Sequence, residues 1–410
     1  MAAIPRVPAL LCLVCLPLVG IAQSGPQPAT QSVTVDPTWN ARLRHEQVDD
    51  GAFARDANAD TLRLRAGLKF AFGDGWSALL EGEGIASTGN HYNSGANGQV
   101  AYPAVIDPNG AELNQAWIGW NGAQAAVKLG RQRILVDNQR WVGNVGFRQN
   151  EQTFDALALE YKPGTGVTLR YSWLDRVHRI SGDEALNRLA RERDLDTHLF
   201  NAAWKHGAQQ LVGYAYLHRD QDVATASTST YGLRWNGDRL QDGNGFSWNA
   251  EAAHQTDYGN NPQAFSHAYW LLEPAYTVSG NTLKAGWERL GGNGSHALQT
   301  PLATLHGFNG AADVFLTTPV GGLDDRYLSA SGKFGHVRDG RFAWAVAWHD
   351  YRANTAPAGM GHYGSEWNAS LVFPLATRLQ ALLKIADYRA DHFARDTTKV
   401  WLQVEWASAK

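Results

Sequence analysis

The sequence predicts an all-β fold: a single antiparallel transmembrane β-barrel of about 18 strands, with short periplasmic turns and long extracellular loops. Three observations lead to this prediction. Apolar and polar residues alternate with a period of two along most of the chain. Short and long connections follow one another in turn, and aromatic residues gather beside the short ones.

The alternation is clearest in residues 61–72. The apolar residues Leu62, Leu64, Ala66, Leu68, Phe70 and Phe72 share one parity, and the charged residues of the other parity are Arg63, Arg65 and Lys69. Successive side chains of a strand point to opposite faces, so this segment has one apolar and one charged face.

A hairpin follows, because Gly73-Asp74-Gly75 is turn chemistry in which glycine accepts a positive φ. Folding back about Asp74 places Arg65 opposite Glu83 and Gly67 opposite Glu81. Taken alone, the hairpin suits a soluble sandwich, with its charged face in water, or a membrane barrel, with its charged face in the lumen.

Composition excludes several classes of protein. The mean hydropathy of −0.35 excludes a helical membrane bundle, whereas alternating barrel strands average to a mildly polar composition. No run rich in Pro, Ser or charge divides the 410 residues into domains. Without the first 22 residues, which carry Arg6, the formal net charge goes from −3 to −4, so global charge predicts no polyanion partner such as a nucleic acid. An argument for a polyanion must come from where the charges lie.

The N-terminus predicts a signal peptide over residues 1–22. An apolar run ends in Gly20-Ile21-Ala22, with small residues suited to cleavage before Gln23. Both cysteines, Cys12 and Cys15, lie in this segment, so the remaining chain has no disulfide or thiolate metal site. We expect a short periplasmic segment at 23–38, the barrel at 39–406 and a tail at 407–410.

Eighteen strands are predicted from the alternation, most of them near the ~9–11 residues of a tilted transmembrane strand. In chain order they are 39–47, 61–72, 76–86, 111–120, 124–134, 153–161, 167–176, 195–205, 208–219, 227–236, 245–256, 264–277, 281–289, 325–335, 341–352, 362–373, 377–390 and 397–406.

The connections decide between the two interpretations of the hairpin. Links after even-numbered strands are mostly short, and many links after odd-numbered strands are long, namely 48–60, 87–110, 135–152, 177–194 and 290–324. Short turns on one rim and long loops on the other are typical of an outer-membrane barrel, and a soluble sandwich has no reason to sort them. An even strand count places both chain ends on the periplasmic side.

Aromatic residues beside the short turns indicate a girdle at one membrane interface. They are Phe72, Trp76, Trp120, Tyr161, Trp204, Trp235, Phe246, Tyr276, Phe334, Phe342 and Phe373. The preference of aromatic residues for strands does not explain why they gather at one end.

Two segments carry a family resemblance. One runs from Val127-Lys-Leu-Gly-Arg131-Gln-Arg133 through Arg140 and Arg148 to Asp155, and the other is the loop at 291–325, which begins Gly-Gly-Asn-Gly-Ser-His. Together they resemble the alginate export family of outer-membrane proteins, and the resemblance extends more loosely over the rest of the mature chain. It implies an eighteen-stranded barrel that exports an anionic polysaccharide through an arginine-lined constriction.

The residues themselves leave two interpretations of the charges open. Arg131, Arg133, Arg140 and Arg148 suit carboxylates, because guanidinium groups bind them bidentately. They equally suit an internal lattice with Asp137, Glu151 and Asp155 as partners. Likewise, Arg63, Arg65 and Lys69 face Glu81 and Glu83, and such opposed charges often only brace a wall.

The resulting hypothesis is an outer-membrane channel of the Gram-negative envelope, without cofactor, metal site or catalysis, that passes an alginate-like polysaccharide. The alternative is a diffusion porin for small organic acids or oligosaccharides. A barrel enzyme acting on lipid would need an outward-facing cluster of Ser, His and Asn near one rim, and no motif in the sequence supports one. Partners would be the bilayer, the polysaccharide and periplasmic export proteins. The apolar residues of loop 291–324 predict that it folds into the lumen or across its mouth.

Overall fold

The computed structural model describes residues 33–337, 340–357 and 359–408. The predicted signal peptide and most of the segment 23–38 lie outside these residues. Strands make up nearly all the regular structure: β1 (Thr34–Asp50), β2 (Ala57–Gly73), β3 (Trp76–Ser87), β4 (Gly110–Asn121), β5 (Ala125–Gln132), β6 (Thr153–Gly164), β7 (Val167–His178), β8 (Glu192–His206), β9 (Gln209–His218), β10 (Thr228–Gln241), β11 (Asn244–Asp257), β12 (Ser266–Val278), β13 (Asn281–Leu290), β14 (Leu323–Val337), β15 (Gly340–Arg352), β16 (His362–Ala376), β17 (Leu379–Ala390) and β18 (Thr397–Ala407). Within the described residues, the loops contain one short helix, α1 (Arg188–Arg191), and two 3-10 turns, η1 (Ala224–Ala226) and η2 (Leu305–Gly307).

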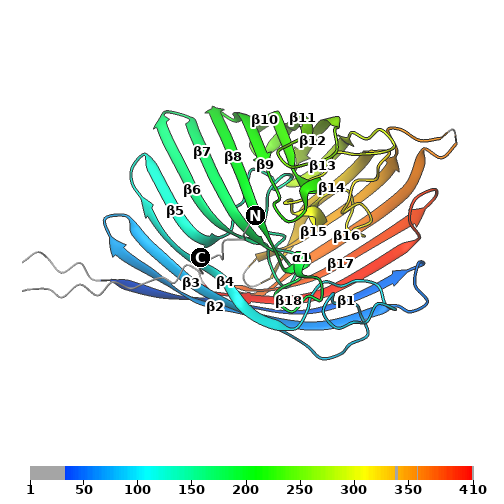
Figure 1. The fold of residues 1–410 in the computed structure, drawn as a ribbon, viewed down its shortest axis with the longest axis horizontal. Helices are drawn as coiled ribbons and strands as arrows, with labels where there is room; N and C mark the ends of the chain where they lie inside the picture. The colour runs from blue at the N-terminus through cyan, green and yellow to red at the C-terminus, as the bar shows by residue number, and fades with distance from the viewer. Residues whose placement is uncertain (1–32, 338–339, 358, 409–410) are drawn as a thin grey trace, which may run out of the picture. The chain divides into compact units, whose positions relative to one another are not determined.

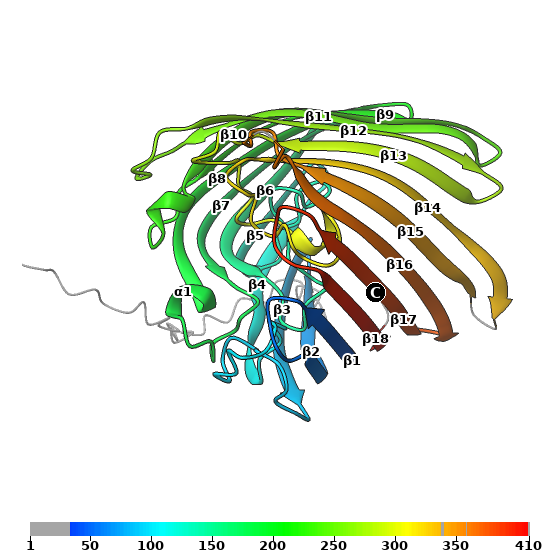
Figure 2. The ribbon, with the colours of Figure 1, turned by 90° about the vertical axis from the view of Figure 1, so that its right-hand side faces the viewer.

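The strands form a closed antiparallel barrel, in which each strand pairs with the next and β18 pairs with β1. Figures 1 and 2 show the closure, where the red C-terminal strand lies beside the blue N-terminal one. Every predicted strand overlaps the observed strand of the same order, which confirms the predicted fold. The register of the first hairpin is also confirmed, because Arg65 lies opposite Glu83 and Gly67 opposite Glu81.

The first strand corrects one predicted boundary. β1 begins at Thr34, inside the segment expected to precede the barrel at 39. Residues 34–39 pair with β2, but β18 ends opposite Asn40, so this end of β1 has a strand neighbour on one side only. The alternation argument missed it because Asp36-Pro37 interrupts the pattern.

Loop lengths are sorted as predicted. The links after even-numbered strands have two or three residues, such as 74–75 and 242–243. The links after odd-numbered strands have six or more, and the longest are 88–109, 133–152 and 291–322. Asp74, Asp242 and Ser279 take a positive φ in the short turns, as tight hairpins require.

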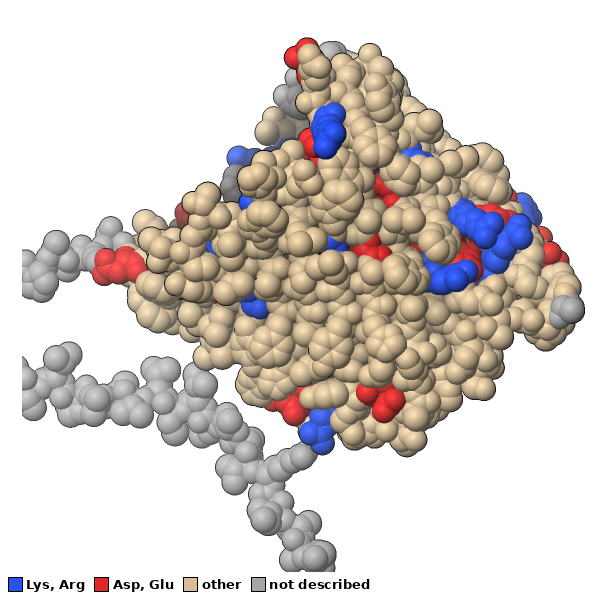
Figure 3. All heavy atoms as spheres, turned by 90° about the horizontal axis from the view of Figure 1, so that it is seen from above, with Lys and Arg blue, Asp and Glu red and all other residues tan. Residues whose placement is uncertain are grey.

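The outer surface is layered along the strands. The periplasmic girdle is exposed, as at Trp76, Trp204 and Tyr276. A second set of outward aromatic residues, Trp270 and Trp367, lies six positions nearer the long loops than Tyr276 and Phe373. Beyond it, outward ion pairs form a charged belt: Arg131–Asp155, Arg176–Asp194, Arg289–Asp324, Arg352–Asp350 and Arg389–Asp387. Figure 3 shows a largely uncharged outer face, on which the largest group of charges lies near one end.

Two long loops fold into the barrel, and we call them inner loop 133–152 and inner loop 291–322. Figure 2 shows the yellow segment of the second loop inside the ring of strands. Its Leu298, Leu302 and Phe315 are buried, which confirms the prediction that this loop enters the lumen. The loop also contacts the wall, because the backbone N–H of Ala312 donates a hydrogen bond to Glu366 Oε1 at 2.8 Å.

Candidate functional site

Four arginines from β1 and β2 line one side of the lumen, and we call them the arginine wall. Arg42 and Arg44 alternate with the lipid-facing Leu43, and Arg63 and Arg65 alternate with Leu64. Alternate residues of a strand share a face, and this one points inward. Arg42 and Arg63 are register partners, so the four guanidinium groups lie close together.

Two lysines extend the arginine wall toward both ends of the barrel. Lys399 of β18 lies opposite Val48, four residues nearer the long loops than Arg44. Lys69 of β2 lies opposite Asp36, toward the short turns. From outside to inside the order is Lys399, Arg44, the pair Arg42 and Arg63, Arg65 and Lys69, and we call this row the cationic stripe. It covers twelve residues of strand, or about 40 Å at ~3.3 Å per residue.

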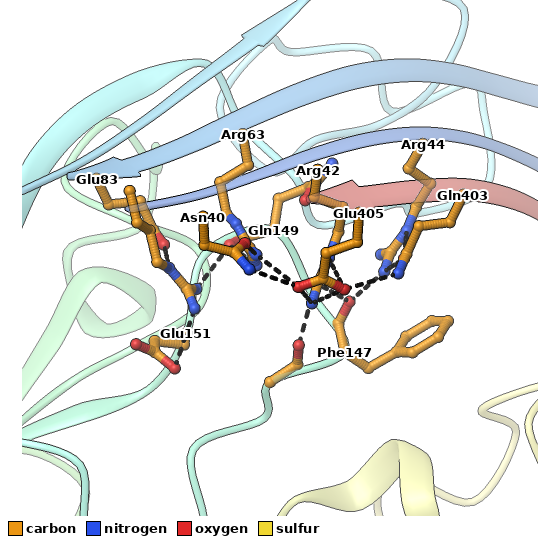
Figure 4. Close-up of polar contacts among 12 residues, drawn as sticks. Asn40, Arg42, Arg44, Arg63, Glu83, Phe147, Gln149, Glu151, Gln403 and Glu405 are labelled. Atoms are coloured by element: carbon orange, nitrogen blue, oxygen red, sulfur yellow. Dashed lines mark hydrogen bonds and ion pairs between the residues drawn. The ribbon is translucent and has the colours of Figure 1, made fainter. Parts of the chain in front are cut away.

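Inner loop 133–152 covers the middle of the stripe. Figure 4 shows guanidinium groups pointing from the strands toward Phe147 and Gln149 of the loop. Arg44 donates to the carbonyl oxygen of Phe147 at 2.5 Å, and Arg65 donates to that of Gln149 at 3.1 Å. The four arginines are therefore only 1–8% exposed.

Carboxylates of the wall neutralise three of these arginines, and Arg44 lies 3.7 Å from Asp107 of loop 88–109. Arg42 contacts Glu405 of β18 at 3.2 Å, and Arg63 contacts the same carboxylate at 3.4 Å. Arg65 pairs with Glu83. Buried charges of this kind are retained only when they are paired, since the desolvation of each ion costs several kcal/mol.

Arginines of inner loop 133–152 make the reverse connection, to acidic groups on the wall and on other loops. Arg148 contacts Glu46 of β1 at 2.5 Å, and Arg140 contacts Glu288 of β13 at 2.7 Å. Burial would lower the pKa of both arginines, but Asp107 and Glu46 raise that of Arg148, and Glu288 raises that of Arg140, above the ordinary value. The charges thus hold the loop against two separate parts of the wall, β1 and β13.

Glu151 is the acidic centre of this loop. It pairs with Arg133 and lies 3.4 Å from Arg65, and it accepts hydrogen bonds from Asn114 and Asn144 at 2.7 Å. Burial alone would raise the pKa of Glu151, but Arg65 and Arg133 lower it to about 2. Glu151 is therefore ionised at any ordinary pH.

A row of polar contacts holds inner loop 291–322 against the wall. Lys384 of β17 donates to His306 Nε2 at 2.7 Å, and His306 Nδ1 donates to Asp313 at 2.7 Å. Lys399 contacts the other oxygen of Asp313 at 2.9 Å. Burial lowers the pKa of His306 to about 3, so the ring is neutral, and it stacks on Phe147 with centroids 3.7 Å apart.

Two cavities lie on either side of this covered region. The outer cavity, of about 710 Å³, is lined by Arg148, Arg179 and Lys399, among others. The inner cavity, of about 510 Å³, is lined by Lys69, Lys128 and Arg133. Their linings share no residue, and the cationic stripe has Lys399 in one and Lys69 in the other.

The structure separates one predicted pair from the lumen. Arg131 contacts Asp155 at 3.0 Å, and His178 also contacts Asp155 at 3.0 Å. Arg131 has the parity of the exposed Leu129, so the pair belongs to the outer charged belt, and Arg131 does not join the other arginines. The predicted arginine cluster extends past the end of β5 at Gln132, and beyond a strand end the alternation no longer tells which side of the barrel a side chain faces.

The remaining predicted site residues do lie inside the barrel. Glu81 accepts from Asn114 and Gln115 at 2.8 Å and lies 3.3 Å from Arg133. Asp137 accepts from Asn201 at 2.9 Å and lines the inner cavity.

Sequence reasoning missed several lumen residues. Arg42 and Arg44 carried the same alternation as residues 61–72, so the pattern was available in Arg42-Leu43-Arg44. Lys384 had no such signal, because it stands in the apolar run Leu382-Leu383-Lys384-Ile385.

Neither a metal cluster nor a membrane-crossing helix occurs in the described part of the chain. No group of three or more His, Cys, Asp or Glu residues there is placed to hold a metal ion. No helix within the described ranges is long and apolar enough to span a membrane.

Solved structures with the same fold are outer-membrane porins. Pseudomonas aeruginosa OccK9 (OpdG) matches with a TM-score of 0.71 at 14% identity, over 91% of this chain and 98% of its own. The structure of P. aeruginosa OpdK with vanillate matches with a TM-score of 0.69 at 14% identity, over the same shares. A BenF-like porin from Pseudomonas fluorescens Pf-5 matches with a TM-score of 0.70 at 12% identity, over 91% and 98%.

No curated protein matches the chain in sequence. The family model for alginate export matches residues 35–288, which is more than half of the chain. The match covers both arginine-bearing strands, inner loop 133–152 and the wall as far as Glu288. The protein is therefore an outer-membrane channel, and the chain belongs to the alginate export family.

Proposed function

We propose that this channel passes an anionic polysaccharide of the alginate type, guided by contacts between its carboxylates and the cationic stripe. The observation that carries the proposal is the stripe itself, which runs from Lys399 in the outer cavity to Lys69 in the inner cavity. A polymer with a carboxylate on every residue can contact several members of such a row at once.

The chemistry of the arginine wall fits this substrate. Its guanidinium groups already bind carboxylates, those of Glu405 and Glu83. A uronate presents the same group, so these guanidinium groups can bind it in the same bidentate way. Covalent chemistry is not needed, since preorganised charge is enough to select and guide an ion.

Passage requires inner loop 133–152 to move. Arg44 and Arg63 are each 1% exposed beneath it, so a polymer reaches them only when the loop leaves the wall. Lys69 and Arg133 are accessible without this movement, because both line the inner cavity. We therefore infer that the polymer first binds at the periplasmic end.

The second candidate is the diffusion of small organic acids or oligosaccharides. The two inner loops favour it, since they narrow the middle of the barrel and leave cavities of a few hundred cubic ångströms, a common size for small-ligand sites. The similar fold of OpdK, whose structure holds vanillate, gives this candidate a precedent.

Planar bilayer recordings test the proposal. We expect anion selectivity in a potassium chloride gradient, and block by polymannuronate at lower concentration than by dextran of equal length. The double variant Arg65→Gln/Glu83→Gln removes a cation and its partner together, and Glu151 keeps Arg133, so it leaves no buried charge unpaired. It should require about tenfold more polymannuronate for the same block.

Arg176→Gln is the matched control, because Arg176 lies in the outer charged belt. Cation selectivity, or equal block by dextran and polymannuronate, would contradict the guiding role. Uptake of small carboxylates into proteoliposomes without any block by polymer would favour the second candidate.

A further inference from the structure

A groove on the lipid-facing surface of β13, β14 and β15 lies apart from the lumen. Its volume is about 370 Å³, and its lining residues are Ala285, Gly286, Trp287, Arg326, Tyr327, Leu328 and Trp348. The small residues at 285 and 286 form its floor between two tryptophans. Nothing in the proposed transport path uses it.

Strand register orders the outward residues around this groove into rows. The two rows toward the membrane centre are apolar: Ala285, Leu328 and Trp348, then Leu283, Ala330 and Val346. The two rows toward the long loops are polar or charged: Trp287, Arg326 and Asp350, then Arg289, Asp324 and Arg352. Successive rows are about 6.6 Å apart along the strands.

Most charges in the upper rows are already paired. Arg289 contacts Asp324 at 2.7 Å, and Arg352 contacts Asp350 at 2.8 Å. Asp324 also accepts from Trp287 Nε1 at 3.0 Å, and Asp350 lies 2.9 Å from His362 Nε2. Both carboxylates are thus occupied.

Arg326 is the exception. It is exposed and has no hydrogen-bond or ion-pair partner among the described residues. It stands directly above Leu328 on the same face of β14, at the boundary between the apolar and the charged rows. An unpaired cation above an apolar groove matches a molecule with an anionic head and an acyl chain.

We propose that this groove binds a phosphate-bearing lipid of the outer leaflet, with an acyl chain against Ala285, Leu328 and Trp348 and a phosphate on Arg326. The apolar rows face the bilayer, where a polysaccharide or a free ion would not lie. Tryptophans suit the boundary, because their rings are apolar and their N–H groups are polar. Arg289 and Arg352 keep further guanidinium surface exposed above Arg326.

Native mass spectrometry of the barrel in mild detergent tests this site. The probe is diphosphorylated, hexa-acylated lipid A, titrated against the wild type and the variant Arg326→Gln. Loss of one charged contact should weaken binding about tenfold. Arg389→Gln is the matched control, since Arg389 is an exposed arginine near the same end but is paired with Asp387. It should bind as the wild type does.

A second pair of variants addresses the groove rather than the charge. Ala285→Phe fills the floor and should also weaken lipid A binding, whereas Ala252→Phe, on the outer face of β11, should not. Lipid A without phosphates should bind the wild type as weakly as lipid A binds Arg326→Gln. Equal binding by Arg326→Gln, equal binding of the phosphate-free lipid, or displacement of lipid A by inorganic phosphate would overturn the proposal.

Discussion

At the scale of single residues, the lumen is controlled by buried ion pairs between distant parts of the chain. Arg148 and Glu46 are 102 positions apart, and Arg63 and Glu405 are 342 apart. Removing one partner of such a pair typically costs about 3–5 kcal/mol, because the other charge stays buried. A change in pH or a substitution that removes one charge of such a pair can therefore release an inner loop.

Glu151 provides a test by pH. Its pKa is about 2 in the folded protein and about 4.3 when unfolded, so its stabilising effect is complete above about pH 4.3 and is lost as the pH falls toward 2. The difference corresponds to about 3 kcal/mol. We expect inner loop 133–152 to loosen and conductance to rise below pH 4, measured in planar bilayers.

The variant Glu151→Gln should show the raised conductance already at pH 7, and Asp396→Asn, at the exposed rim, should behave as the wild type. If Glu151→Gln and the wild type give the same conductance at both pH values, Glu151 does not hold the loop.

Single residues also show where sequence reasoning reached its limit. The position of Arg65 opposite Glu83 followed from the alternation and one turn. The side of the barrel on which Arg131 lies did not follow, because Arg131 and Arg133 stand on either side of the end of β5. The alternation of side chains holds only within a strand. For a cluster that extends past a strand end, the sequence therefore does not predict which side of the barrel each residue faces.

At the scale of elements, strands and loops differed in how well they could be predicted. Each strand has its own pattern of period two, which is a local property. The inner loops have no such pattern, and their conformations depend on wall residues 54 to 102 positions away. Only the excess of apolar residues in inner loop 291–322 indicated that it would be covered.

Replacing residues 293–320 with a short Gly-Ser link should raise single-channel current. The ends of the segment are adjacent, because a Cβ built on Gly292 would lie 2.6 Å from Gly322 Cα. The barrel can therefore close without the loop, and the lumen loses the side chains of Leu298, Leu302 and Phe315. Shortening loop 258–265, which stays outside, is the control. An unchanged current in a heat-modifiable barrel would show that the loop does not constrict the pore.

A point variant can separate the effect of loop docking on the current from the effect of loop size. Gly310 has a φ of +86°, and a Cβ there would lie 2.3 Å from both Glu366 Oε2 and Tyr351 Oη. Gly310→Ala should therefore undock inner loop 291–322 without shortening it, and the current should rise less than in the deletion.

At the scale of the whole molecule, the barrel has a defined orientation. Short turns face the periplasm and long loops the exterior, so Ser279 and Gln263 lie on opposite sides of the membrane. Both native cysteines fall within residues 1–22. A membrane-impermeant maleimide should label Gln263→Cys on intact cells and Ser279→Cys only after the outer membrane is permeabilised. The reverse pattern would invert the orientation.

The pairing of β1 with β18 determines when the barrel can close during its synthesis and assembly. The eleven residues from Asn40 to Asp50 are made early, yet their partners, 397–407, are the last strand made. Until those arrive, one edge of β1 offers unpaired N–H and C=O groups, which template aggregation. The growing chain therefore has no stable halfway state. The whole chain must be secreted before the barrel can close, and a chain truncated before β18 cannot form the barrel.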